Sequence, residues 1–151
     1  MGDHATNSGF RYSRRVGWGD CDPACIAYSG RIPDFALEAI DAFWEHHLDG
    51  DGWFQLNIDR GIGTPFVHIE IDVQKPITPR HPLICEVIPK RLGSTSMTFE
   101  VIGSQGSQQC FKGNFVCVFV TSGEFKKIEV PEIIRRRLRE KFEDISDNRD
   151  R

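Results

Sequence analysis

The chain has 151 residues, a length that favours one domain around a single hydrophobic core. Hydrophobic residues make up 39% of the chain and charged residues 27%, and the formal net charge of −3 gives no reason to expect a nucleic acid as partner. No apolar run approaches the roughly 20 residues that a membrane span needs, so we expect no membrane partner. The five cysteines show no C-x-x-C spacing and no apolar leader precedes them, which favours reduced thiols in a cytoplasmic protein.

The first half of the chain predicts a strand, a loop and a long helix. Residues 1–9 are polar and we expect a flexible N-terminus, after which apolar and polar residues alternate over Phe10–Trp18 as in a strand. A helix is predicted over about Pro33–His47, with a start near Gly30 that leaves its proline in the first turn. Apolar residues cover most of its circumference, which predicts burial. Residues 48–65 are rich in Gly and Asp and indicate an irregular connection.

The second half predicts strands. Residues 67–73 alternate strictly between apolar and polar side chains, which predicts a strand with one face in the core. A hairpin turn is expected at 103–106, and Pro89 indicates an edge, a bulge or an early end of its strand. The three further strands are predicted at residues 83–92, 96–103 and 110–121.

A second helix is predicted to open at Pro131-Glu132, with arginines toward its C-terminal end. A solvated face is the simplest interpretation of those arginines, although a coenzyme phosphate or a partner subunit could use them. Residues 143–151 are expected to form a charged flexible tail. The order of elements predicts a single α+β domain over residues 10–142, in which an antiparallel β-sheet wraps around one long hydrophobic helix.

The loop before the long helix is the candidate site. Asp20 and Asp22 lie two residues apart, and Pro23 disfavours helical geometry at Asp22, so its carboxylate should project where the chain changes direction. Unpaired N–H groups at the start of a helix can bind an anion or a polarised carbonyl oxygen. A carboxylate beside such a helix end suggests acyl chemistry.

Three segments resemble the hotdog-fold acyl-CoA thioesterases, and specifically the 4-hydroxybenzoyl-CoA thioesterase-like family. The run Gly19-Asp20-Cys21-Asp22-Pro23-Ala24 reproduces its signature, Arg60-Gly61-Ile62-Gly63-Thr64-Pro65 resembles a second motif with one residue missing, and Ile128-Glu129-Val130-Pro131 resembles its closing strand-to-helix junction. The resemblance implies the hotdog fold and hydrolysis of an acyl-CoA, aromatic or aliphatic, to a carboxylate and free coenzyme A. It implies no cofactor, because coenzyme A is part of the substrate.

The resemblance also assigns roles to residues. Asp22 matches the catalytic carboxylate, which acts either as a nucleophile that forms a mixed anhydride or as a base that activates water. An ionised aspartate is a weak base, which favours the nucleophile. The backbone N–H of Ser29 or of Gly30 would polarise the thioester carbonyl. The expected substrate-binding residues are Tyr28, Thr64, Pro65 and His68, and no metal ligand is expected.

Several residues have competing interpretations. Asp20 is expected to shape the loop, and Glu38 is the rival catalytic carboxylate because another hotdog branch uses a glutamate on the central helix. Cys25 replaces a glycine that is usual in the family, and we expect a small buried thiol there. His46 and His47 are expected to lie at a solvated helix end.

A lone hotdog domain leaves a sheet edge unprotected, so we expect a homodimer, and the resemblance implies a homotetramer of two such dimers. The active site would lie between subunits, with Thr64 or His68 supplied by the partner. Two alternatives stay open. One is a non-catalytic protein that binds acyl thioesters, and the other is a hotdog dehydratase or hydratase, which would need a histidine beside its carboxylate.

Overall fold

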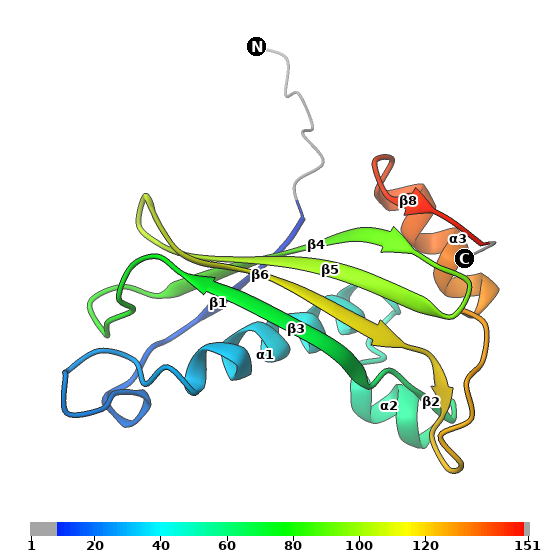
Figure 1. Ribbon diagram of the computed structural model, residues 1–151, viewed down its shortest axis with the longest axis horizontal. Coiled ribbons are helices and arrows are strands. Elements are labelled where there is room, and N and C mark those ends of the chain that lie inside the picture. The colour runs from blue at the N-terminus through cyan, green and yellow to red at the C-terminus, as the bar shows by residue number, and fades with distance from the viewer. Residues whose placement is uncertain (1–8, 150–151) are drawn as a thin grey trace.

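The structure is a computed structural model that describes residues 9–149. Over this range one sheet, antiparallel except for the short strand β8, curves around one long helix, α1 (Figure 1). The sheet has the strand order β1-β4-β5-β6-β3, and β8 pairs with β4. Its strands are β1 (Phe10–Arg14), β3 (Phe66–Val73), β4 (Leu83–Leu92), β5 (Ser96–Gln105), β6 (Gln108–Val118) and β8 (Ser146–Asp147).

The remaining elements lie at the ends of the sheet. A short ladder joins β2 (Ile62–Gly63) to β7 (Val120–Thr121). The helices are α1 (Arg31–His47), α2 (Trp53–Ile58) and α3 (Glu132–Lys141), and a 3-10 turn covers Trp18–Asp20. The predicted α+β architecture with a central helix is therefore confirmed for the described residues.

Helix α1 supplies the middle of the core. Phe43 and Trp44 are fully buried and meet the ring of Phe99 on β5 edge-on, with centroid distances of 5.3 and 5.6 Å. The helix begins directly after Gly30, which places Pro33 in its first turn as predicted. The broad apolar surface of α1 is therefore explained by the sheet that curves around this helix and buries it.

Strand β4 occupies the predicted residues, and its register shifts between Pro89 and Arg91, which confirms a bulge at the proline. The hairpin turn between β5 and β6 lies two residues later than predicted, with Gly106 and Ser107 at its centre. Gly103 belongs to β5 instead. A Cβ atom there would come within 2.1 Å of the Phe111 ring, so this glycine marks a close approach rather than a turn.

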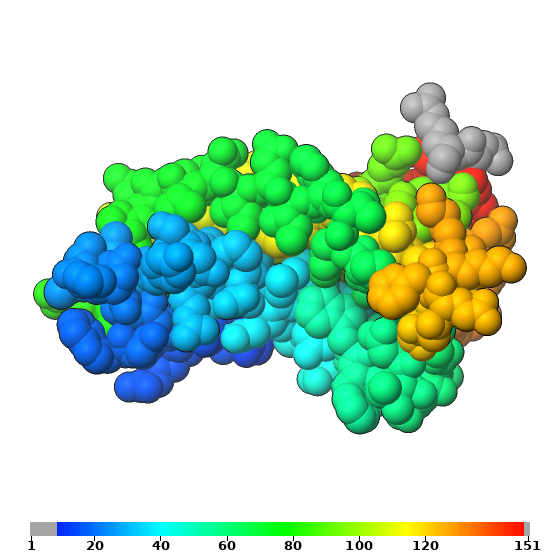
Figure 2. All heavy atoms as spheres, turned by 60° about the horizontal axis from the view of Figure 1, so that its bottom comes forward, coloured from blue at the N-terminus to red at the C-terminus, as the bar shows by residue number. Residues whose placement is uncertain are grey.

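The prediction that β3 buries one face is wrong. Val67, Ile69 and Val73 are 63%, 44% and 56% exposed at this edge of the sheet, where only β6 pairs with β3, and of the four alternating apolar residues only Ile71 packs against the core. Figure 2 shows this strand in green along one face of the molecule. Alternation in the sequence reports the pleat of a strand but not which neighbour covers it.

Three further predictions in the first half need correction. Trp18 does not extend the first strand, which ends at Arg14; it lies in the 3-10 turn and is 72% exposed. The connection at residues 48–65 contains helix α2, whose first N–H, on Trp53, donates to the side chain of Asp41 at 2.7 Å. His47 is not solvated either, because its ring packs against Phe43 with centroids 4.5 Å apart.

The expected flexible tail is also corrected over residues 143–149. Strand β8 pairs in parallel with the end of β4, and Asp147 accepts a hydrogen bond from Arg135. Arg135 is only 3% exposed and also donates to the carbonyl of Gly93 at 2.7 Å, so it does not belong to a solvated face. Residues 1–8 and 150–151, which hold the rest of the two predicted flexible ends, lie outside the described residues.

Candidate active site

Asp22 lies at the start of a tight turn between β1 and α1. Its N–H donates to the carbonyl of Ile26 at 3.1 Å, and its own carbonyl accepts the N–H of Cys25 at 2.9 Å. The side-chain Oδ1 accepts the N–H of Ala24 at 2.8 Å, as expected of an aspartate before a proline. Within residues 9–149 the Oδ2 atom accepts no hydrogen bond. One carboxylate oxygen is thus held by the turn, and the other is free for a reacting group.

The two ends of this turn are held together and anchored on the sheet. Cys21 and Ala27 form an antiparallel bridge, and the N–H of Tyr28 donates to the carbonyl of Asp20 at 2.8 Å. The N–H of Ala27 donates to the carbonyl of Ile77 at 2.7 Å, in the connection between β3 and β4. These bonds fix the turn that carries Asp22.

The chain passes from this turn directly into α1. Ser29 and Gly30 are exposed, and across the described chain neither backbone N–H donates a hydrogen bond to another residue. The Tyr28 ring lies over Gly30, where a Cβ atom would stand 2.5 Å from Cε1 of the tyrosine. The two free N–H groups point to a site that can bind a carbonyl oxygen or an oxyanion.

Cys25 is not the small buried thiol that the sequence suggested, because it is exposed. Its φ angle is +64°, in the left-handed region that a residue with a side chain adopts at a cost. This geometry explains why the resembling family has a glycine here: the turn needs a positive φ, and only glycine adopts it freely.

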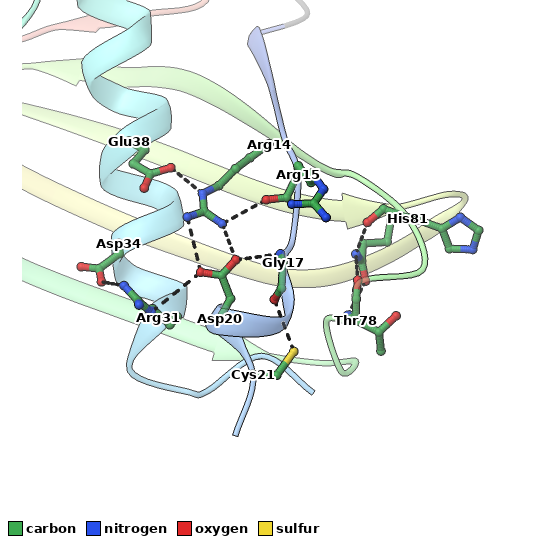
Figure 3. Close-up of polar contacts among 11 residues, drawn as sticks. Arg14, Arg15, Gly17, Asp20, Cys21, Arg31, Asp34, Glu38, Thr78 and His81 are labelled. Carbon is green, nitrogen blue, oxygen red and sulfur yellow. Dashed lines mark hydrogen bonds and ion pairs between the residues drawn. The ribbon is translucent and has the colours of Figure 1, made fainter. Parts of the chain in front are cut away.

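The two rival carboxylates are held by Arg14 of β1 (Figure 3). Its Nη1 donates to Oδ2 of Asp20 at 2.9 Å, and its Nε donates to Oε2 of Glu38 at 2.6 Å. The same Asp20 oxygen accepts the N–H of Gly17 at 2.9 Å. The hydrogen bond from Arg14 lowers the pKa of Asp20 below its usual value, so Asp20 stays charged and shapes the loop. Glu38 on α1 is occupied in the same way.

A pocket of about 350 Å³ opens at the other end of the molecule. It lies where α2, the start of β3 and the segment after β7 meet, and Figure 2 shows these segments far from the loop of residues 18–30, drawn in blue. The lining is mostly apolar and includes two of the predicted residues, Thr64 and Pro65. The full lining is Leu37, Trp53, Asn57, Gly63, Thr64, Pro65, Phe66, Ser122 and Phe125.

The predicted site residues therefore fall into separate groups within one chain. The turn and helix start carry Asp22, Tyr28, Ser29 and Gly30, whereas Thr64 and Pro65 line the distant pocket. His68 lies on the exposed edge strand β3, with its Nε2 3.4 Å from the carboxylate of Glu70. The sequence missed Trp53 and Phe125 as lining residues, because only the tertiary fold brings α2 and the segment after β7 together.

The chain matches the family model of the thioesterase-like superfamily over residues 16–138, and it belongs to that family. A thioesterase superfamily protein from Jannaschia sp. CCS1 has 47% sequence identity and a TM-score of 0.84, covering 90% of this chain and 94% of that one. The fold is thus the hotdog fold of thioesterases, and the chain is a thioester hydrolase. Among curated proteins, none matches it.

More distant structures share the fold. The 1,4-dihydroxy-2-naphthoyl-CoA thioesterase from Synechocystis has 22% identity and a TM-score of 0.74, over 85% of this chain and 94% of that one. A gentisyl-coenzyme A thioesterase has 21% identity and a TM-score of 0.75, over 83% and 99%. Within residues 9–149 no helix is long and apolar enough to cross a membrane, and no three His, Cys, Asp or Glu side chains gather where they could hold a metal ion.

Proposed function

We propose that this chain hydrolyses an acyl-CoA to a carboxylate and free coenzyme A, with Asp22 as the reacting group. The observation that carries the proposal is the pairing of a carboxylate that has one free oxygen with free N–H groups at the adjoining start of α1. The structural relatives that act on naphthoyl-CoA and gentisyl-CoA support an aromatic acyl group, and so does an apolar pocket rich in aromatic side chains.

In this mechanism Asp22 Oδ2 attacks the thioester carbonyl carbon. The N–H of Ser29 or Gly30 donates to the carbonyl oxygen as negative charge develops there. The C–S bond then breaks, coenzyme A leaves as a thiolate, and water hydrolyses the mixed anhydride to regenerate Asp22. If Asp22 acts as a base instead, it takes a proton from the water that attacks the carbonyl, and the products are the same.

The separation of Asp22 from the pocket supports a site between two subunits. Strand β3 runs from the end that carries α2 toward the end that carries the Asp22 loop (Figure 1), and its outer edge exposes Val67, Ile69 and Val73. Antiparallel pairing of two β3 edges about a two-fold axis would bring the pocket of one subunit beside the Asp22 loop of the other. Thr64 would then come from the partner, in a dimer or in a tetramer of dimers.

A thiol-release assay over aromatic and straight-chain acyl-CoAs tests the proposal. We expect Asp22→Asn to lower kcat by at least about a hundredfold, because the amide is neither a nucleophile nor a base. The matched control is Asp34→Asn, which removes an exposed carboxylate in the first turn of α1 and should leave kcat within about twofold.

Unchanged turnover in Asp22→Asn would overturn the assignment of Asp22. Saturable binding of an acyl-CoA without hydrolysis would favour the non-catalytic alternative. A dehydratase would instead remove water from a 3-hydroxyacyl-CoA without releasing a thiol, so 3-hydroxyacyl-CoAs assayed by mass would reveal it.

A further inference from the structure

A second cleft, of about 300 Å³, lies beside the loop that carries Asp22. The end of β1 and the residues after it form one wall, and the connection between β3 and β4 forms the other. Two arginines and a histidine line it and no carboxylate does. The lining residues are Ser13, Arg15, Val16, Pro79, Arg80, His81 and Pro82.

The two arginines of this cleft have no carboxylate partner in the described chain. Most arginines between residues 9 and 149 form an ion pair, as Arg14 does with Asp20 at 2.9 Å. The described arginines without such a pair are Arg15, Arg80, Arg91 and Arg136. A guanidinium without an internal partner can offer its planar pair of donors to an external anion, and it matches phosphate well.

The wall that carries Arg80 is held rigidly by a buried side chain. Gln105, at the end of β5, is 8% exposed, and its Nε2 donates to the carbonyls of Thr78 and His81, both at 2.7 Å. Its Oε1 accepts the N–H of Thr78 at 3.0 Å. Figure 3 shows Thr78 and His81 in this network. Arg80 therefore projects from a loop that is fixed before any ligand binds, which lowers the entropy cost of binding.

Both walls are tied to the reacting loop. The Ile77 carbonyl, in the same connection as Arg80, accepts the N–H of Ala27 at 2.7 Å and so holds the base of the Asp22 turn. On the other wall, the carbonyl of Arg15 accepts a hydrogen bond from Arg14 Nη1 at 3.2 Å, and the same guanidinium donates to Asp20, just before that turn. The cleft and the Asp22 loop are thus parts of one rigid unit.

We propose that Arg15 and Arg80 bind the phosphate groups of coenzyme A, with His81 beside them. The inference rests on the proposed function, because it places the coenzyme half of that substrate. Coenzyme A is strongly anionic and must approach the carboxylate of Asp22, which forms no ion pair within the described residues, whereas Asp20 is paired with Arg14. Two unpaired cations beside this loop offset the repulsion and hold the nucleotide while the thioester reaches Asp22.

Lys90 and Arg91 are two further cations that could hold a phosphate group, but in one chain they lie far from the Asp22 loop. Lys90 and Arg91 lie toward the end of β4 that pairs with β8, whereas Leu83, at its start, pairs with Arg14 beside the Asp22 loop. Eight residues of strand separate Arg91 from Leu83, roughly 26 Å at about 3.3 Å per residue. In a dimer those cations could serve the partner's site, so they belong in the test as rivals.

The test compares two thioesters of the same acyl group, one of coenzyme A and one of N-acetylcysteamine, which has no phosphate. We expect Arg15→Gln and Arg80→Gln each to raise KM for the acyl-CoA by about tenfold and to leave kcat within about twofold. The KM for the N-acetylcysteamine thioester should not change in either variant. Arg136→Gln, an unpaired arginine on α3, is the matched control and should behave as wild type.

Equal effects on both thioesters, or no effect on either, would overturn the proposal, as would a selective effect of Arg91→Gln alone. Calorimetric binding of free coenzyme A provides a readout that does not need catalysis. Wild type should bind it, and Arg15→Gln with Arg80→Gln should weaken that binding by about a hundredfold together. Absence of binding by wild type would also overturn the site. Failure of the proposed function gives a different result: either neither thioester is hydrolysed, or Asp22→Asn keeps full activity.

Discussion

At the scale of single residues, Cys25 adopts a backbone conformation that is unfavourable for a residue with a Cβ atom. Its φ of +64° lies where a Cβ atom is unfavourable by about 1–2 kcal/mol relative to glycine. We therefore expect Cys25→Gly to raise the free energy of unfolding by about 1 kcal/mol. Part of this gain is offset because glycine has greater conformational freedom in the unfolded chain. Urea denaturation measures it.

The control for this prediction is Cys25→Ala, which removes the thiol but keeps the Cβ atom and should bring no gain in stability. Because Cys25 is exposed and its backbone only shapes the turn, kcat should stay within about threefold in both variants. A large loss of activity in Cys25→Ala together with Cys25→Gly would mean that the thiol takes part in the reaction.

His47 should make stability depend on pH. Burial, with smaller effects from His46 and Lys141, lowers its pKa from 6.5 to about 4. The unfolded chain therefore binds a proton on this residue at a pH where the folded chain does not. The free energy of unfolding should therefore fall as the pH drops from about 6.5 to about 4. Above about pH 6.5 His47 is neutral in both states, so it should not change the stability further.

Denaturant titrations at about pH 7 and about pH 5 measure this effect. His47→Gln should reduce the difference in stability between the two conditions. The exposed neighbour provides the control, since His46→Gln keeps the buried ring of His47 and removes only a smaller cause of its lowered pKa, so it should reduce the difference much less than His47→Gln. An equal pH dependence in wild type and His47→Gln would show that another group titrates.

At the scale of elements, β8 is held to the sheet by a buried charge. Asp147 lies against Arg135, Arg139 and Arg149, of which Arg135 is nearly inaccessible. Replacing Asp147 by Ala leaves the Arg135 guanidinium buried without its counter-charge, and we expect a loss of about 3 kcal/mol in the free energy of unfolding.

Thermal and urea unfolding provide the measurement for this pair. Glu132→Ala is the surface control, because the Glu132–Arg149 pair is mostly exposed and should contribute less than about 1 kcal/mol. The double variant Arg135→Leu, Asp147→Leu should lose less than either charge removed alone. Equal losses from the Asp147 and Glu132 variants would contradict a buried pair.

The elements that sequence patterns predicted well are those whose signal is local and repeated. Fully and partly buried residues alternate along β4 from Leu83 to Pro89 and its bounds were predicted correctly, and α1 carries apolar residues over four turns. Helix α2 was missed because six residues are too few to show a repeated helical pattern of apolar side chains, and because the residues around it are rich in Gly and Asp. The burial of Arg135 was missed because its counter-charge, Asp147, lies in an element that the sequence does not signal.

The residues of the candidate site also differ in how well the sequence alone identifies them. Asp22, Ser29 and Gly30 are neighbours in the chain, so a motif and a proline identify them. Trp53 and Phe125 meet in the pocket only through the fold, and nothing local marks them. Phe125 even adopts a φ of +54°, which no propensity would suggest for a bulky aromatic residue.

At the scale of the whole molecule, a site shared between subunits predicts that two inactive variants restore each other. Asp22→Asn removes the proposed reacting group, and Phe125→Asp places a charge in the apolar pocket. In a mixed dimer one of the two sites combines an intact Asp22 with an intact pocket. After joint unfolding and refolding of equal amounts, about a quarter of all sites should be intact.

The measurement is thiol release by the mixture compared with each variant refolded alone. A site contained within one chain would predict no recovery, because every chain carries a defect. A mixture of Asp22→Asn with Asp22→Asn, Phe125→Asp supplies the control, since none of its sites holds an aspartate at position 22.

The distance between the Asp22 loop and the apolar pocket within one chain has a practical consequence for protein engineering. The acyl group would be selected by α2 and by the segment after β7, which share no hydrogen bond with the turn that carries Asp22. Substrate range could then be redesigned by varying Trp53, Asn57 and Phe125 in one library, while the reacting loop stays constant. The selectivity for the acyl group could then be changed without changing the residues of the chemical step.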